Sequence, residues 1–165
     1  MVSGDFTFKK FAENNFYRVV NGRVVELAQV RPGQRIVDLA CGTGAVTRLI
    51  LERLKGACDS VVIGIDHSSA ALKQALEDLG NAKEGAVQFI QSRIENLSEA
   101  VKESADTVIF CNAIHYIPDK DALVEKVAGV LRPGGTFAFN TSFFDTPLEP
   151  ETSLFYRKWM FKALR

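Results

Sequence analysis

The sequence predicts an α/β protein with a doubly wound parallel sheet, because two kinds of pattern alternate along the chain. Five short runs are rich in β-branched and aromatic residues and almost continuously apolar, as strands are when both faces of a parallel sheet are covered. The segments between most of them carry apolar residues at helical spacing, which predicts crossover helices. The predicted strands lie at residues 35–39, 61–65, 87–90, 107–110 and 136–139.

Four helices are predicted from apolar residues that recur three or four positions apart and so share one helix face. The first precedes the first strand and ends before Arg31. Gly80 stands where the third should end, and Arg-Pro-Gly-Gly at 132–135 stops the fourth. The four faces are Phe16, Val19, Val20, Val24 and Leu27; Val46, Leu49, Ile50 and Leu54; Ala71, Leu72, Ala75, Leu76 and Leu79; and Leu123, Val124, Val127, Val130 and Leu131.

A chain of 165 residues is sized for one domain. We predict a helical cover over residues 1–30, a core over 31–142, and a loop with a C-terminal helix over 143–165. No further strand is visible after the fifth, so the fifth is expected to have an open edge that another domain or a partner chain could cover. The sequence is therefore expected to continue in a longer protein or to be completed by a partner.

Composition excludes several classes of function. The 20 basic and 20 acidic residues cancel, and no basic stripe with interleaved aromatic residues is present, so nucleic acid is not an expected partner. No apolar run approaches the roughly 18 residues of a membrane span. Three cysteines without a CxxC pair and two histidines give no metal-ligand spacing, so no metal is expected. Reduced thiols fit the cytoplasm, where we expect the protein.

A glycine-rich turn follows the first predicted strand. Residues 37–44 read Val-Asp-Leu-Ala-Cys-Gly-Thr-Gly, a strand that runs into a turn and then a helix. Glycines let the backbone approach a ligand, the helix start offers unpaired N–H groups, and this turn is where doubly wound sheets hold a nucleotide. A dinucleotide fingerprint would need a third glycine where Thr47 stands, which disfavours a nicotinamide-dependent oxidoreductase.

An acidic residue ends the second predicted strand. Asp66 lies 22 residues after Gly44, where a carboxylate can accept two hydrogen bonds from a ribose diol, and Ser68 is a predicted N-cap. With Asp66, the turn resembles motif I of the class I S-adenosylmethionine-dependent methyltransferases, commonly D-x-x-C-G-T-G or D-x-G-x-G-x-G. Ala40 replaces the first glycine of the second form, a departure that needs an ordinary φ at this residue.

The resemblance continues in three later segments, 89–97, 110–116 and 131–136, and covers about residues 24–142. It implies a Rossmann-like fold of seven strands in the order 3-2-1-4-5-7-6, of which the last two are not found here. Arg93 stands where the family has an acid that accepts from the adenine amino group, and Arg93 can only donate. Ser92 could accept in its place, and the N–H of Ile94 could meet a ring nitrogen.

The resemblance implies S-adenosyl-L-methionine as the cofactor and gives binding roles to residues of this chain. Asp66 would bind the ribose hydroxyls and His67 would pack against the adenine. Asn112 would place main-chain acceptors near the methionine amine, and Tyr17 is placed either to close over the cofactor or to be a buried structural residue. The residues implied around the methionine part are Asp38, which would hold the ammonium through water, Ala40, Cys41, Gly42 and Gly44.

Few catalytic side chains are expected, because methyl transfer from a sulfonium needs mainly alignment and exclusion of water. His115 and Tyr116 follow the fourth strand, where the family's active site opens, and His115 is the candidate base; the alternative is that both only pack the loop. Cys41 at the loop–helix junction is expected to be a small packing residue rather than a nucleophile, although such a position could lower a thiol pKa.

The implied reaction is methyl transfer to a small, apolar organic acceptor. Eight of the 12 phenylalanines, with Tyr156 and Trp159, lie outside the predicted core, where they could line an apolar pocket or equally cover the sheet edges. The alternative function is a cofactor-binding module without turnover, or a fragment of a larger multidomain enzyme. The flanking phenylalanines are Phe6, Phe8, Phe11, Phe16, Phe143, Phe144, Phe155 and Phe161.

Overall fold

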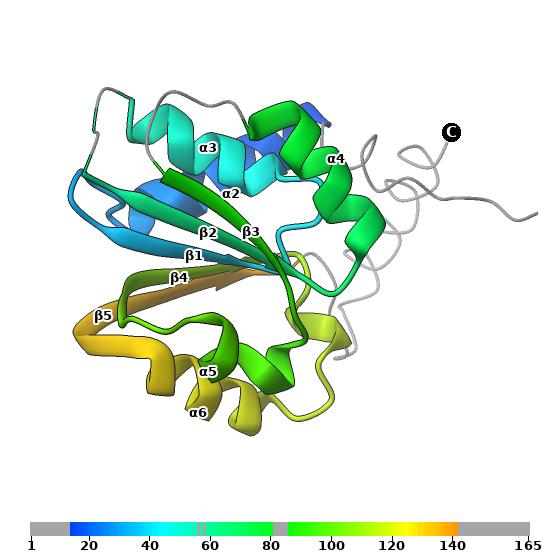
Figure 1. The fold of residues 1–165 in the computed structure, drawn as a ribbon, viewed down its shortest axis with the longest axis vertical. Helices are drawn as coiled ribbons and strands as arrows, with labels where there is room; N and C mark the ends of the chain where they lie inside the picture. The colour runs from blue at the N-terminus through cyan, green and yellow to red at the C-terminus, as the bar shows by residue number, and fades with distance from the viewer. Residues whose placement is uncertain (1–13, 56, 58, 81–85, 142–165) are drawn as a thin grey trace, which may run out of the picture.

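A five-stranded parallel sheet forms the centre of the molecule, with helices on both faces (Figure 1). The computed structural model describes residues 14–55, 57, 59–80 and 86–141. The strand order β3-β2-β1-β4-β5 confirms the predicted fold class and matches the first five strands of the order that the resemblance implies. The strands are β1 (Arg35–Leu39), β2 (Val61–Asp66), β3 (Ala86–Gln91), β4 (Ala105–Cys111) and β5 (Leu131–Asn140).

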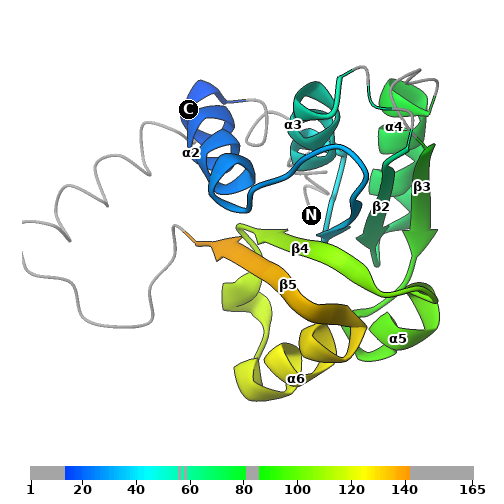
Figure 2. The ribbon, with the colours of Figure 1, turned by 90° about the vertical axis from the view of Figure 1, so that its left-hand side faces the viewer.

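Within the part of the chain that the structure describes, one group of helices covers one face of the sheet and a second group covers the other (Figure 2). Two buried apolar clusters fill the spaces between the layers, one under each group of helices. The first group is α2 (Asn15–Leu27), α3 (Ala45–Arg53) and α4 (Ser69–Leu79); the second is α5 (Leu97–Ala100) and α6 (Lys120–Val130). Two single-turn 3₁₀ helices, η1 (Ile94–Asn96) and η2 (Ile114–Tyr116), precede α5 and α6.

Side-chain caps explain where several helices begin. Asn14, Ser68 and Asp119 each accept a hydrogen bond from a backbone N–H in the first turn of α2, α4 and α6. Ser68 therefore caps α4 as predicted, and Gly80 ends it as predicted, with an ordinary φ of −63°. The N-cap of α3 is Gly44, which has no side chain, so that helix needs its acceptor from elsewhere.

The helix α2 ends before Arg31, as predicted, but buries a different face. Phe16, Val19 and Leu27, predicted to face the core, are exposed. The buried residues are instead Tyr17, Asn21 and Val25, which lie four positions apart. The prediction failed because it counted only apolar residues, whereas the buried stripe includes a tyrosine and an asparagine. Leu76 of α4 and Val124 of α6 are likewise exposed members of predicted faces.

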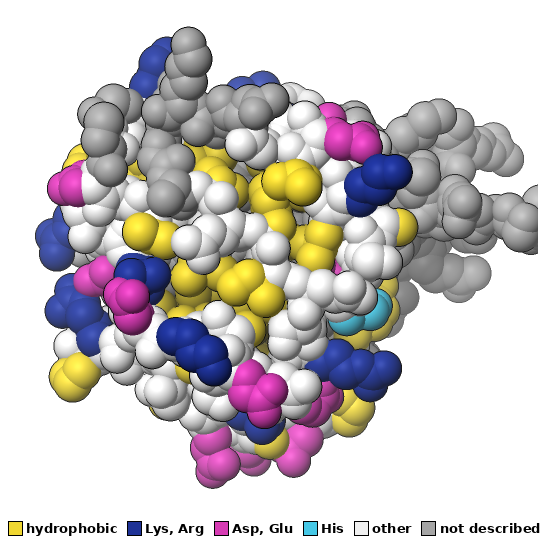
Figure 3. Space-filling view, in the orientation of Figure 1, with side chains coloured by type: hydrophobic (Ala, Val, Ile, Leu, Met, Phe, Trp, Pro, Cys, Tyr) yellow, Lys and Arg dark blue, Asp and Glu magenta, His cyan; other side chains and the backbone are white. Residues whose placement is uncertain are grey.

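The strand β5 begins five residues earlier than predicted. Leu131, assigned to the fourth helix face, is already extended, with φ −80° and ψ 141°. The pairing of β5 with β4 shifts from Ala105↔Leu131 to Thr107↔Thr136, so the stretch 132–135 that stops the helix is an irregular start of the strand. Among the described residues β3 and β5 are the edge strands, and hydrophobic side chains reach the surface over β3 (Figure 3). The predicted segment 143–165 lies outside the described residues.

The described helices include none that is both long and apolar enough to cross a membrane. Of the flanking phenylalanines, Tyr156 and Trp159, only Phe16 falls in the described part of the chain, where 47% of it is exposed. Phe6, Phe8, Phe11, Phe143, Phe144, Phe155, Tyr156, Trp159 and Phe161 lie outside the described residues.

Candidate functional site

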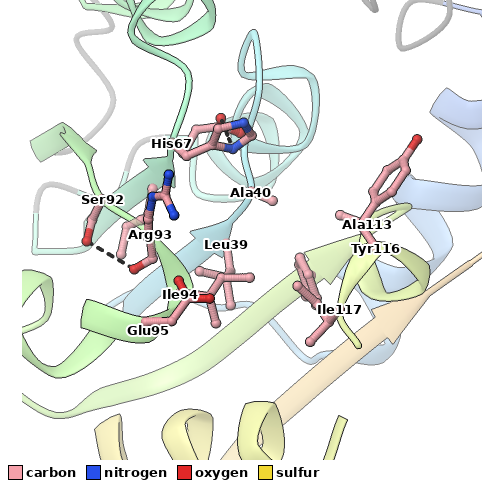
Figure 4. A pocket seen from close by; sticks show the side chains of 13 residues that line it. Leu39, Ala40, His67, Ser92, Arg93, Ile94, Glu95, Ala113, Tyr116 and Ile117 are labelled. Atoms are coloured by element: carbon pink, nitrogen blue, oxygen red, sulfur yellow. Dashed lines mark hydrogen bonds and ion pairs between the residues drawn. The ribbon is translucent and has the colours of Figure 1, made fainter. Parts of the chain in front are cut away.

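A cavity of about 370 Å³ opens at the carboxyl ends of β1, β2 and β4 and beside the segment that follows β3 (Figure 4). Parallel strands bring these ends to one edge of the sheet, which is where open α/β sheets bind ligands. Ser92 and Arg93 line one side, and Tyr116 and Ile117 line the other. The remaining lining residues are Leu39, Ala40, Ile65, Asp66, His67, Ile94, Glu95, Phe110 and Ala113.

The turn after β1 is built from three residues with positive φ. Gly42 and Gly44 have φ of 53° and 84°, and Ala40 has φ of 55°. The expectation of an ordinary φ at Ala40 is therefore wrong. A non-glycine residue in this conformation costs roughly 1–2 kcal/mol, because its Cβ approaches the following carbonyl. The turn holds Ala40 there because the next residue, Cys41, donates its N–H to the carbonyl of Ile65 at 3.0 Å.

Gly44 also permits a close approach between helices. A Cβ at this position would lie 2.7 Å from Leu79 Cδ1 and 3.3 Å from Ala75 Cβ, both on α4. The start of α3 therefore sits against α4 without room for a side chain. Gly42 has no atom within 4 Å of such a Cβ, so its backbone faces open space beside the cavity.

Asp66 joins the turn after β1 to the end of β2. Its Oδ2 accepts the Gly42 N–H at 2.8 Å and its Oδ1 accepts the Ser68 N–H at 2.9 Å. Asp66 is only 8% exposed, yet it lines the cavity. Because each carboxylate oxygen can accept two hydrogen bonds, both oxygens retain capacity for a ligand hydroxyl. The exposed His67 ring lies beside it, with Nδ1 3.4 Å from Asp66 Oδ1.

Asp38 supplies the acceptor that Gly44 lacks at the start of α3. Its Oδ2 accepts the Thr47 hydroxyl at 2.5 Å, and Asp38 also interacts with the Thr47 backbone N–H in the first turn. Asp38 is 1% exposed, and this burial raises its pKa to about 7, with the Asp66 charge adding to the rise and the Thr47 bonds opposing it. Asp38 does not line the cavity.

Cys41 is a packing residue in the structure. Burial raises the pKa of its thiol, and the charges of Asp38 and Asp66 act in the same direction, so the thiol stays protonated. Its Sγ lies over β2, 3.1 Å from where Gly64 would carry a Cβ. These findings agree with the expectation of a packing role, and the lowered pKa that a loop–helix junction could produce is not present.

The segment after β3 carries the side chains predicted to meet the base. Ser92 donates its hydroxyl to the Arg93 carbonyl at 3.1 Å, which leaves the hydroxyl oxygen able to accept. Arg93 is exposed, and Ile94 is half-buried at the cavity wall. Glu95 lines the same wall and was not among the predicted site residues.

The loop after β4 places the predicted catalytic residues near the opposite wall. His115 and Tyr116 rings lie 4.0 Å apart between centroids, and His115 Nδ1 lies 3.1 Å from Thr141 Oγ1, just beyond β5. Tyr116 lines the cavity and is 62% exposed, whereas His115 is not a lining residue. Tyr17 is 2% exposed and packs edge-on against Phe16, which agrees with the structural alternative.

The cavity thus brings together seven of the predicted site residues. Ala40, Asp66, His67, Ser92, Arg93, Ile94 and Tyr116 line it. The other seven predicted residues do not line it. They lie in β1 and the turn that follows it, in the segment after β4, or on α2. They are Asp38, Cys41, Gly42, Gly44, Asn112, His115 and Tyr17.

Sequence reasoning missed two polar side chains behind the site. Thr47 was used only to reject a dinucleotide fingerprint, yet it bonds Asp38, and the nine-residue spacing between them spans the turn. Asn21, which is buried, was missed because it lies within an otherwise apolar helix pattern. The available signal was an asparagine in the middle of that pattern, because a polar side chain that becomes buried there needs a hydrogen-bond partner. No group of three or more His, Cys, Asp or Glu that could hold a metal occurs in the described ranges.

Comparisons with known proteins agree with this architecture. A family described as a methyltransferase domain matches residues 31–158. A probable S-adenosylmethionine-dependent methyltransferase of Saccharomyces cerevisiae is 37% identical over 119 residues, covering 70% of this chain and 39% of the relative. The trans-aconitate 2-methyltransferase of Delftia acidovorans is 35% identical over 115 residues, covering 69% and 39%. The chain therefore spans about two fifths of the length of these relatives.

A solved structure shows the same fold. The SAM-dependent methyltransferase from Aquifex aeolicus superimposes with a TM-score of 0.65 at 14% identity, covering 94% of this chain and 85% of that one. At that identity the likeness bears on the fold alone, and the fold it supports is the Rossmann-like sheet described above. Since the family match extends over most of the sequence, this chain belongs to the methyltransferase domain family.

Proposed function

We propose that this chain binds S-adenosyl-L-methionine and transfers a methyl group to a small organic acceptor. One observation carries the proposal: Asp66, at the end of β2, bonds the glycine turn after β1 and lines the cavity at the same time. This arrangement places an acceptor for sugar hydroxyls beside exposed backbone of a glycine turn, in a volume within the range of about 300–1,000 Å³ typical of ligand pockets.

The residues present suit the cofactor chemically. Asp66 would accept from the ribose hydroxyls, and the open space beside Gly42 would admit the chain that carries the amino acid part. The Asp66 carboxylate, which lines the cavity, provides negative charge for a cationic ligand. Asp38 lies outside the lining and adds a carboxyl that is partly ionised at neutral pH, because burial raises its pKa to about 7. Ser92 and Ile94 would meet the base, the first through its hydroxyl oxygen and the second through its N–H and apolar side chain. His67 would pack against the base, and Arg93 would donate at its rim.

When bound, the cofactor supplies a methyl group activated on a sulfonium. The protein's part is to hold both partners in line and to exclude water. Leu39, Ile65 and Phe110 form an apolar floor suited to that exclusion. We assign His115 as the group that accepts a proton when the acceptor is a hydroxyl or amine, with its ring oriented by Thr141, and Tyr116 as a wall of the acceptor pocket.

A small apolar acceptor is the finer part of the proposal. It is supported by Ile117 and Ala113, which line the side of the cavity where Tyr116 lies (Figure 4). The name of the Delftia acidovorans relative gives trans-aconitate, a small molecule, as that protein's substrate. We further propose a division of the chain at residues 30 and 142 and a cytoplasmic location, which the free, buried thiols of Cys41 and Cys111 suit. A further domain or partner chain is proposed at the β5 edge, which is open within the described residues.

Calorimetric titration with S-adenosylmethionine tests the proposal directly. The wild-type chain should bind, Asp66→Asn should weaken binding at least tenfold through loss of a charge-assisted hydrogen bond, and NAD should not bind. Asp119→Asn is the matched control, because it removes another carboxylate that accepts an N–H at a helix start, on α6 and away from the cavity. Equal effects of the two variants, or no binding by the wild-type chain, would overturn the cofactor assignment.

Turnover distinguishes an enzyme from a binding module. Release of S-adenosylhomocysteine in the presence of a panel of small acids, phenols and amines should occur with the wild-type chain. His115→Gln should lower kcat for hydroxyl and amine acceptors and leave cofactor affinity unchanged. Cofactor binding without turnover on any acceptor would support the non-catalytic alternative.

A further inference from the structure

Helix α2 lies beside the ends of β4 and β5 (Figure 2). Three asparagine side chains meet there. Asn21 lies in the middle of α2, Asn112 follows β4 directly, and Asn140 is the last residue of β5. The Oδ1 of Asn21 accepts both the Asn112 Nδ2 and the Asn140 Nδ2, each at 3.0 Å. These contacts join segments 91 and 119 residues apart in the sequence.

A second set of bonds links the two strand ends to each other. The Asn112 N–H is shared between the carbonyl oxygen of Asn140 at 3.1 Å and its Oδ1 at 2.9 Å. Asn112 has φ of 57°, a conformation that asparagine tolerates but that still needs support. The three side chains together therefore fix the point where the chain leaves β4.

Asn21 is a costly residue for packing alone. It is 3% exposed, and asparagine is less favourable than alanine in a helix interior by several tenths of a kcal/mol. Buried polar side chains specify geometry, because any shift that breaks their bonds leaves a donor or acceptor unsatisfied. A helix that only covered the sheet could use an apolar residue here, as Val25 does one turn later.

The two strand ends lead directly into the acceptor side of the cavity. Ala113, a lining residue, follows Asn112, and His115 and Tyr116 come next in η2. Thr141 follows Asn140 and contacts His115 Nδ1 at 3.1 Å. The asparagine cluster thus lies at the start of both segments that place the His115 ring.

We propose that Asn21 is a positioning residue: through Asn112 and Asn140 it fixes the ends of β4 and β5, and with them the loop that carries His115 and Tyr116. The expected effect of Asn21 on kcat rests on the proposed function, whereas its effect on the position of the loop is measured in the protein without any ligand. This role makes α2 part of the working site, although Asn21 lines only a separate cavity of about 220 Å³ and does not line the larger one.

The test compares Asn21→Ala with Val25→Ala, a matched loss from the same buried stripe of α2. Hydrogen exchange of the Asn112 N–H, followed by NMR relative to the Ile109 N–H within β4, should accelerate about tenfold in Asn21→Ala and stay unchanged in Val25→Ala. The acceleration is expected because Asn21→Ala removes both hydrogen bonds that hold the Asn112 and Asn140 side chains. The kcat of Asn21→Ala should fall more than that of Val25→Ala at equal loss of stability.

Asn21→Asp provides the conservative variant, because it keeps an oxygen that can accept from both amides. The cavity beside it is lined by Arg18 and Arg48 and also by Glu52 and Asp78. The variant should restore slow exchange at Asn112 and most of kcat. Unchanged exchange at Asn112 in Asn21→Ala, or equal kcat in the two alanine variants, would overturn the inference. If the wild-type chain fails to bind S-adenosylmethionine, the proposed function fails, and the exchange measurement still decides whether Asn21 positions the loop. If Asn21→Ala does not fold, Asn21→Leu, which fills a similar volume but has no acceptor for the two amides, takes its place in both measurements.

Discussion

Alanine substitutions at Gly42 and Gly44 separate two requirements of the glycine turn, a backbone with positive φ and a close contact without room for a side chain. Both residues have positive φ, so each alanine should lower the free energy of unfolding by roughly 1–2 kcal/mol through backbone strain. Only Gly44 also lacks space, because its Cβ would lie 2.7 Å from Leu79 Cδ1 and 3.3 Å from Ala75 Cβ. Leu79 is 6% exposed, so it has little room to move, and overpacking adds about 1–3 kcal/mol.

Gly44→Ala should therefore lower the free energy of unfolding by about 2–5 kcal/mol, and Gly42→Ala by only about 1–2 kcal/mol. Urea denaturation measures both, and thermal unfolding gives the same order, at about 2–4 °C per kcal/mol for a chain of this size. Adding Leu79→Ala should remove the packing part of the Gly44→Ala loss and leave the Gly42→Ala loss unchanged. Equal losses in the two alanine variants would refute the packing argument and leave only backbone strain.

Three further predictions follow from buried polar groups. Thr107→Val should raise the free energy of unfolding by about 1 kcal/mol, because Thr107 Oγ1 is buried without a hydrogen-bond partner; a loss of stability in urea would show that the hydroxyl is satisfied. Burial raises the pKa of Asp38 from 3.8 to about 7, so the folded protein holds this proton more tightly than the unfolded chain does. The resulting stabilisation of the folded state is complete below pH 3.8 and is lost as pH rises through 7. The stability of the wild-type chain relative to Asp38→Asn should fall over that interval by up to about 4 kcal/mol, and a pH-independent difference would contradict it. Cys41 should react with iodoacetamide at pH 8 only on unfolding, as its raised thiol pKa and burial require, and mass spectrometry of the native protein would reveal the contrary.

The sheet could be predicted from the sequence because its central strands, β1, β2 and β4, are buried on both faces. Continuous apolar runs such as 61–65 predict strands that are covered on both faces. The glycine turn with Asp66 predicts the edge of the sheet where ligands bind. The observed pairing confirms the predicted parallel sheet, since β1 pairs in parallel with β2 on one side and with β4 on the other.

Local patterns could not predict features that depend on tertiary contacts. The positive φ at Ala40 is held by the bond from Cys41 to Ile65, and no propensity of alanine indicates it. The buried face of α2 is decided by bonds from Asn21 to residues about 90 and 120 positions away, which helical periodicity does not see. The early start of β5 at Leu131 depends in the same way on its pairing with Ala105.

The two hydrogen bonds that the Asp66 carboxylate accepts from the backbone limit how this site can change in evolution. The carboxylate that the proposed ligand would use also fastens Gly42 to the end of β2 and accepts the Ser68 N–H at the start of α4. A substitution at this position would therefore weaken the fold before any selection on activity acted, and the cell would degrade much of the altered protein. Drift toward a different ligand should accordingly begin at exposed lining positions such as Arg93 and Tyr116, whose side chains can change at little expense to folding.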